Sequence, residues 1–133
     1  MRTTKLSVFS LIVLSAVAFA AEKVAISDLL KKADDFDKKT VVLVGKVDNF
    51  KAKVSKAGNP YFTFKLLDDK DNKVSIYSRG KLEKDLEDGQ KVEVTGTFKK
   101  ESKVGANTFK NEVDISKDEN DKKTKDFGVK VVK

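Results

Sequence analysis

The chain has 133 residues, enough for one domain with a single hydrophobic core. Its formal net charge is +7, which leans towards anionic partners, although lysine and glutamate alternate too evenly to give a dense positive field. With no cysteine and no histidine, the chain lacks disulfides, thiol nucleophiles, imidazole metal ligands and the usual general base near neutral pH. No P-loop, Rossmann glycine motif or G-x-S-x-G elbow occurs either. We therefore expect no enzyme activity, no cofactor and no metal site.

Residues 1–20 have the pattern of a secretory signal peptide. Arg2 and Lys5 form a basic start, Leu6 to Phe19 form an apolar region, and Ala18-Phe19-Ala20 supplies an A-x-A cleavage site. The alternative is an uncleaved membrane anchor, but the apolar run is short for a hydrocarbon core of about 30 Å. We predict cleavage after Ala20, which leaves a periplasmic or secreted protein without a stable membrane anchor.

A short amphipathic helix is predicted over residues 25–36. Its apolar side chains recur at three- and four-residue spacing, and Ser27 is a candidate cap for its first turn. The residues on this face are Ile26, Leu29, Leu30, Ala33 and Phe36. We expect the helix to cover an open end of a sheet.

Five short β-runs follow, punctuated by glycine and charged turns. They are Thr40–Val47, Tyr61–Asp68, Lys73–Ser78, Lys91–Phe98 and Asn107–Ser116. A second short helix is predicted over residues 81–88, before Gly89. Five strands with a helix between the third and fourth is the order of an OB-fold, so the predicted class is mainly β, a five-stranded Greek-key barrel with an additional N-terminal helix.

Alternation within the runs separates core from surface. Phe62, Phe64 and Leu66 form the apolar side of the second run. The other predicted core positions are Val74, Ile76, Val92, Val94, Gly96, Phe98, Phe109, Val113 and Ile115, while Lys110, Glu112 and Asp114 are predicted to face outwards. Lone glycines at positions 45 and 96, inside strand patterns, predict bulges or sharp bends.

The predicted OB-fold domain with its N-terminal helix spans residues 21–116, and residues 117–133 are interpreted as a flexible charged tail. Between the second and third runs, Asp68, Asp69, Asp71 and Asn72 offer oxygen ligands for calcium. They lack EF-hand spacing, and Asp and Asn are also typical of tight turns, so we interpret the segment as a turn.

Four motifs carry a resemblance to a known family. They are V-x-L-x-G-x-V from Val41, F-x-F-x-L-x-D from Phe62, V-x-I-Y from Val74 and G-x-x-V-x-V-x-G-x-F from Gly89. In these positions the chain resembles the anticodon-binding and helicase-type OB-fold domains, and more loosely the small secreted bacterial OB-fold proteins. The resemblance implies a nucleic-acid-binding fold.

OB-folds bind ligands on the face of their second and third strands and on the loops joining strands one to two and four to five. The candidate ligand-binding residues are Tyr61, Thr63, Lys65, Ser75, Tyr77 and Arg79 on that face, Lys46 beside it, Lys51, Lys53 and Lys56 in the first loop, and Lys99, Lys100 and Lys103 in the second. Aromatic rings on a basic groove suit stacked bases and phosphates. Surface tyrosines are also ordinary strand residues, and loop lysines are ordinary solubility residues.

We therefore predict an exported module that binds single-stranded nucleic acid or another polyanion. The alternative is an envelope protein of the stress type that binds a partner protein or an oligosaccharide on the same barrel. Steep weakening of binding with salt would favour the first prediction, because counterions are released from the phosphates.

Overall fold

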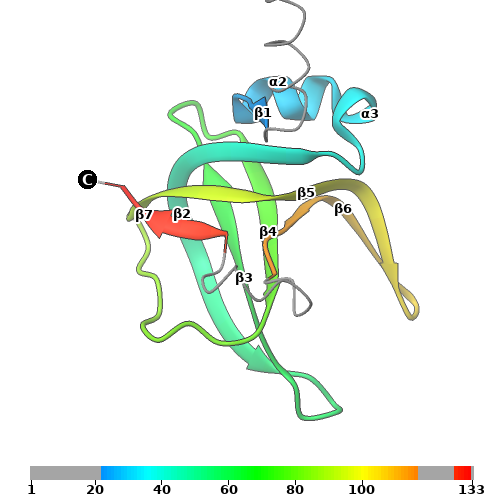
Figure 1. Cartoon of the computed structure of the whole chain (residues 1–133), viewed down its shortest axis with the longest axis vertical. Coiled ribbons are helices and arrows are strands. Elements are labelled where there is room, and N and C mark those ends of the chain that lie inside the picture. The colour runs from blue at the N-terminus through cyan, green and yellow to red at the C-terminus, as the bar shows by residue number, and fades with distance from the viewer. Residues whose placement is uncertain (1–21, 117–127, 133) are drawn as a thin grey trace, which may run out of the picture.

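We analysed a computed structural model of the protein, which describes residues 22–116 and 128–132 (Figure 1). It is mainly β, with short helices near the start of the described chain. The elements are β1 (Glu22–Lys23), α2 (Ile26–Lys31), α3 (Ala33–Phe36), β2 (Thr40–Val54), β3 (Pro60–Leu67), β4 (Lys73–Arg79), β5 (Lys91–Val104), β6 (Asn107–Asp114) and β7 (Val129–Val131). All five predicted strands are present, and two of them are much longer than predicted.

Five strands form a ring in the order β2-β3-β4-β6-β5, which closes through the β2–β5 pairing. The strand β2 serves both sides of the closure: residues 40–46 pair with β5, and residues 46–54 pair with β3. At this change of partner, a Cβ on Gly45 would lie 2.5 Å from the carbonyl oxygen of Leu67. Gly45 therefore permits a close approach of two backbones at a corner of the ring, as its position inside a strand pattern predicts.

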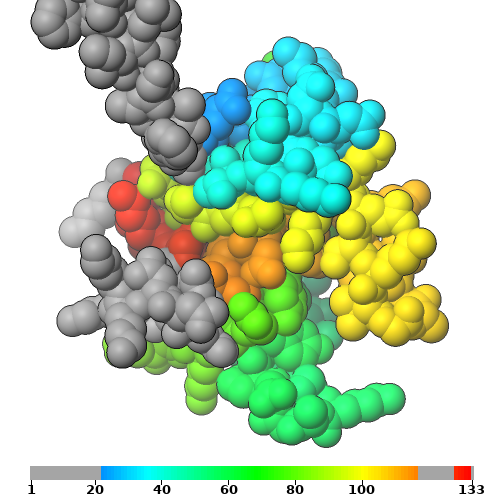
Figure 2. All heavy atoms as spheres, turned by 45° about the vertical axis from the view of Figure 1, so that its right-hand side comes forward, coloured from blue at the N-terminus to red at the C-terminus, as the bar shows by residue number. Residues whose placement is uncertain are grey.

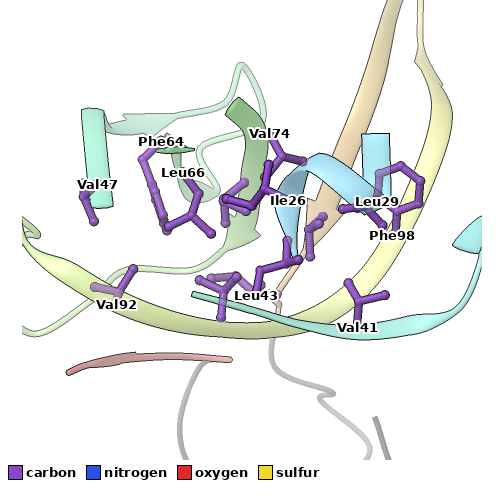
Figure 3. Packing of buried hydrophobic residues seen from close by; sticks show 14 of the residues in the cluster. Ile26, Leu29, Val41, Leu43, Val47, Phe64, Leu66, Val74, Val92 and Phe98 are labelled. Carbon is purple, nitrogen blue, oxygen red and sulfur yellow. The ribbon is translucent and has the colours of Figure 1, made fainter. Parts of the chain in front are cut away.

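The core fills the interior of the ring. Phe62, Phe64 and Leu66 of β3 are buried as predicted. Figure 3 shows Ile26 and Leu29 of α2 pointing into the same interior, towards Val74 and Phe98. The N-terminal helical segment thus covers one end of the ring and buries its own apolar face there.

Helix geometry in this segment differs from the prediction. The segment is divided into α2 and α3 at Lys32, whose φ of −115° and ψ of 38° are not helical. The N-cap of α2 is Ala25, with no side-chain cap hydrogen bond, so the prediction that Ser27 caps the helix is wrong. The predicted apolar residues still pack against the core, because each short helix is stabilised by this contact rather than by its own helix propensity.

The predicted helix at residues 81–88 is also wrong, since this segment contains no helix. Leu82 and Leu86 lie half-buried against the core in an irregular conformation. A segment of this length gains little from helical hydrogen bonds alone, so the packing of its two leucines determines its path.

Two long hairpins account for the other departures. β2 and β3 continue to Val54 and Pro60, and β5 and β6 continue to Val104 and Asn107, so the predicted loops are largely strand. Figure 2 shows both hairpins projecting from the body of the molecule. Phe109 lies on the second projection and is 44% exposed, so its predicted place in the core is wrong. The alternation persists there, but no core remains for the apolar face to cover.

The predicted charged tail falls mostly outside the described residues. Within its last part, β7 pairs antiparallel with β5. The predicted signal peptide also lies outside the described residues. Among residues 22–116 and 128–132, no helix has both the length and the apolar character needed to cross a membrane.

Candidate functional site

The outer face of β3 and β4 carries the polar side chains that alternate with the core. Residues directly opposite one another on neighbouring strands share a face, with Cβ atoms about 4.5–5.5 Å apart. One row across three strands is formed by Lys53, Tyr61 and Arg79, where Tyr61 is the register partner of both cations. We call these three residues the basic row. Neither Lys53 nor Arg79 forms an ion pair with a carboxylate among residues 22–116 and 128–132.

The next row contains the second tyrosine of the chain. Thr63 pairs with Lys51 on one side and Tyr77 on the other, and Tyr77 pairs with Asp114 of β6. The ring centroids of Tyr61 and Tyr77 are 6.0 Å apart with an interplanar angle of 39°. The two predicted outward tyrosines therefore do lie together on this face.

Carboxylates dominate the side of the face towards β6. Burial, with the charge of Asp114 second, raises the pKa of the Tyr77 phenol above its ordinary value. Burial also raises the pKa of Glu112, again with Asp114 adding to the effect. We call Tyr77, Glu112 and Asp114 the acidic corner. Its charges repel an anionic ligand, whereas those of the basic row attract one.

Hydrogen bonds hold this corner in place. The hydroxyl of Ser116 donates to the carboxylate of Asp114 at 2.6 Å and accepts the backbone N–H of Arg79 at 2.9 Å. The Lys99 ammonium lies 4.0 Å from the same carboxylate. Further along the face, the Lys65 ammonium donates to the hydroxyl of Ser75 at 2.6 Å. These cations are committed to neighbours within the protein.

The remaining predicted binding residues are dispersed. Lys46 lies where β2 changes partner, and Lys56 lies in the turn between β2 and β3. Lys100 lies towards α3 instead. Its ammonium donates a hydrogen bond to the carboxylate of Asp34, and its backbone N–H donates one to the carboxylate of Asp37. Lys103 is on the projecting β5–β6 hairpin, opposite Thr108. The structure therefore brings together the predicted residues of β3 and β4 with Lys51 and Lys53, but not the full set of lysines.

The prediction of the site omitted Glu112 and Asp114, although their outward orientation was predicted. The missing information was the parallel pairing of β6 with β4, which places Glu112 opposite Ser75 and Asp114 opposite Tyr77. Alternation assigns a side chain to a face, but it does not say which strand lies next to it.

A small hollow lies between the β2–β3 hairpin and residues 80–85. Its volume is about 230 Å³, and its apolar lining includes Phe50, Phe62 and Leu82. The Phe50 ring lies 5.7 Å from that of Phe62 and 6.2 Å from that of Phe64. Ligand pockets usually enclose about 300–1,000 Å³, so this hollow covers only part of a larger ligand. Lys53 and Tyr61 also contribute to its lining, which joins it to the basic row.

The acidic segment after β3 is a turn, as predicted. The Asp68 carboxylate accepts hydrogen bonds from the backbone N–H groups of Lys70 and Asn72 and from the Asn72 side chain, each at 2.9 Å. The side-chain bond from Asn72 is the main cause that lowers the pKa of Asp68. Within the described ranges, no group of three or more acidic, histidine or cysteine side chains is arranged to hold a metal ion.

Comparison with known protein families matches residues 20–120 to the CcmE domain. The match covers β1 to β6 and both helices, and it spans well over half of the chain, so the chain belongs to the CcmE family. CcmE proteins have an OB fold and are periplasmic haem chaperones of cytochrome c maturation, typically anchored by an N-terminal membrane segment. A search of the curated proteins gave no match.

Family membership corrects several predictions. The resemblance to nucleic-acid-binding domains led to the wrong function, because the matched family carries haem and works with the Ccm proteins CcmC and CcmF. The predicted partners, namely single-stranded nucleic acid, another polyanion or an oligosaccharide, are wrong for the same reason. The carboxylates of the acidic corner, whose position next to β4 the sequence did not predict, also oppose a phosphate backbone. The predictions of a non-enzyme and of a periplasmic location agree with the family.

Proposed function

We propose that this protein handles haem in the periplasm, receiving it and passing it on as part of cytochrome c maturation. The observation that carries the proposal is the CcmE match over residues 20–120, which includes every strand of the five-stranded ring. Haem is here a cargo, and the OB-fold ring is the scaffold that presents a surface to it. On this proposal, its partners are the Ccm proteins that deliver and accept haem.

The composition restricts how the cargo is held. Haem iron is ligated in proteins by histidine, cysteine, methionine or tyrosine. These 133 residues contain no histidine and no cysteine, one methionine, at position 1, and two tyrosines. Attachment of haem through a histidine or cysteine of this chain is therefore excluded. The proposed carrier holds haem reversibly, which is compatible with onward transfer.

Export follows from the N-terminal segment. We propose that Leu6 to Phe19 directs the chain across the membrane and that cleavage occurs after Ala20, within the A-x-A pattern. N-terminal sequencing of the protein recovered from the periplasm tests the cleavage step. Recovery of a chain that starts at Met1 in the membrane fraction would show that the segment is instead retained as an anchor.

Haem binding is tested by titrating residues 21–133 with ferric haem and following the Soret absorbance. We expect a saturable change with a stoichiometry of one haem per protein, and transfer of the haem to an excess of a tighter-binding apoprotein. A lysine-rich protein of similar charge serves as the control for non-specific adsorption. Binding no stronger than that control would reject the proposed function.

A further inference from the structure

We propose that Tyr61 is the protein ligand of the haem iron, seated between Lys53 and Arg79, which bind the anionic groups of the haem. This inference rests on the proposed function and names the site that performs it. Three features of the molecule point to Tyr61: the composition of the chain, the cross-strand register, and the different surroundings of the two tyrosines.

Elimination leaves few candidates. Of the four residue types that commonly ligate haem iron, only tyrosine occurs among the described residues, at positions 61 and 77. Both are half-buried on the outer face, and their rings are neighbours. A ligand on iron must offer an accessible oxygen that is stabilised as an anion, so the surroundings of each phenol decide between them.

The balance of charge differs between the two phenols, and Arg79 lies near both of them. Tyr61 has Lys53 directly opposite on β2 and Arg79 directly opposite on β4. Tyr77 has Asp114 directly opposite on β6, with Glu112 two residues before it on the same strand. Positive neighbours stabilise a phenolate on iron, whereas carboxylates destabilise it. Tyr61 is therefore the ligand, and Tyr77 remains a protonated phenol.

The same row complements the rest of the haem. Haem combines an apolar macrocycle with two anionic propionates. Lys53 and Arg79, which make no ion pair with a described carboxylate, provide the cations for the propionates. An apolar hollow adjoins the row, since Lys53 and Tyr61 share its lining with Phe50 and Leu82, and also with Lys81 and Asp85.

The small hollow fits the proposed role. With a volume of about 230 Å³, it accepts only part of a macrocycle. Haem seated on the basic row would therefore keep one face open to solvent or to a partner. Ferric haem would bind the Tyr61 oxygen with release of the phenol proton to water, and no electron is transferred in the step.

Spectroscopy of ferric haem bound to Tyr61→Phe and Tyr77→Phe variants tests the assignment. Wild type and Tyr77→Phe should give a five-coordinate, high-spin ferric spectrum with an iron–phenolate vibration in resonance Raman. Tyr61→Phe should lose this vibration and bind haem at least about tenfold more weakly, because mutation of even an outer-shell partner of a metal ligand costs about that much affinity. Each variant removes one hydroxyl from the same face, so the pair is matched for fold.

The outcomes separate this inference from the proposed function. Saturable haem binding with an iron–phenolate signal that survives in Tyr61→Phe would overturn the ligand assignment and leave the function standing. An absence of haem binding by the wild type would overturn both. Lys53→Gln combined with Arg79→Gln should weaken binding by up to about fivefold per charge and reduce its dependence on salt while keeping the vibration. Unchanged affinity and salt dependence would show that Lys53 and Arg79 do not bind the propionates.

Discussion

The two faces of β3 come from a single alternation of side chains but differ in what determines their properties. On the inner face, Phe62, Phe64 and Leu66 are at most 2% exposed and have the same kind of environment throughout. On the outer face, Tyr61 lies among cations, while the row that begins at Thr63 leads to the carboxylate of Asp114. Burial makes the inner face uniform. The outer face takes its character from the identity of the neighbouring strands, which is why it can carry a site.

Removing an inner-face ring should have the largest effect. Phe64→Ala leaves a cavity in the ring interior and should lower the free energy of unfolding by about 3–5 kcal/mol. Thr63→Ala, its neighbour on the outer face, is the matched control and should cost less than about 1 kcal/mol. Urea unfolding followed by circular dichroism measures both. Equal losses in the two variants would contradict the assignment of the faces.

A smaller effect on stability is expected at a corner of the ring, where β5 changes its partner strand. β5 pairs with β2 up to Thr97 and with β6 from Thr97 onwards, next to Gly96. A Cβ at Gly96 would overlap the carbonyl oxygen of Asp114. Gly96→Ala should therefore destabilise the protein by about 1–3 kcal/mol, as overpacking does. Ser102→Ala, on the projecting part of the same strand, should change stability by less than about 0.5 kcal/mol. A tolerated alanine at position 96 would show that the corner is less tightly packed.

The acidic turn after β3 should contribute modestly to the stability of the fold. Asp68→Ala removes a carboxylate that accepts three hydrogen bonds and should cost about 0.5–1.5 kcal/mol. The pKa of Asp68 is lowered in the folded state, so its contribution is present above the ordinary pKa and is lost as the pH falls through the folded value. Asp69→Ala is the control, and a similar loss in both variants would argue against a stabilising role for the hydrogen bonds of Asp68.

Charge in the acidic corner should give the smallest effect, with the opposite dependence on pH. The pKa of Glu112 is raised in the folded state by burial and by Asp114. The folded protein therefore binds the proton more tightly than the unfolded chain, and stability is lost as the pH rises through the folded pKa. Glu112→Gln should be more stable than the wild type at pH 7, with the difference disappearing below the ordinary glutamate pKa of about 4.3. Thermal unfolding across this range measures it, and a variant less stable at pH 7 would contradict the sign.

Alternation in the sequence was sufficient to predict the five strands, the inner face of β3 and the outward tyrosines. It was not sufficient where the chain leaves the core. Phe109 continues a correct alternation on a hairpin that has no interior, and Leu82 and Leu86 pack without forming the helix that their spacing suggested. Both outcomes depend on tertiary contacts that local patterns do not contain.

The basic row could not be predicted because it depends on register. A bulge between Asp48 and Lys51, with Asn49 at a φ of 57°, sets the pairing that puts Lys53 opposite Tyr61. A lysine predicted to lie in a loop thereby becomes a fixed neighbour of the phenol. A shift of one residue would turn its side chain to the other face. The sequence contained the three residues of the row, but their juxtaposition comes from the fold.

The most direct measurement of the central claim is amide chemical-shift mapping of the protein titrated with gallium protoporphyrin, a diamagnetic analogue of ferric haem. We predict that the largest perturbations fall on the amides of Lys53, Tyr61 and Arg79, with smaller ones around the acidic corner. Saturable perturbations confined to other surfaces, with these three amides unmoved, would contradict the account.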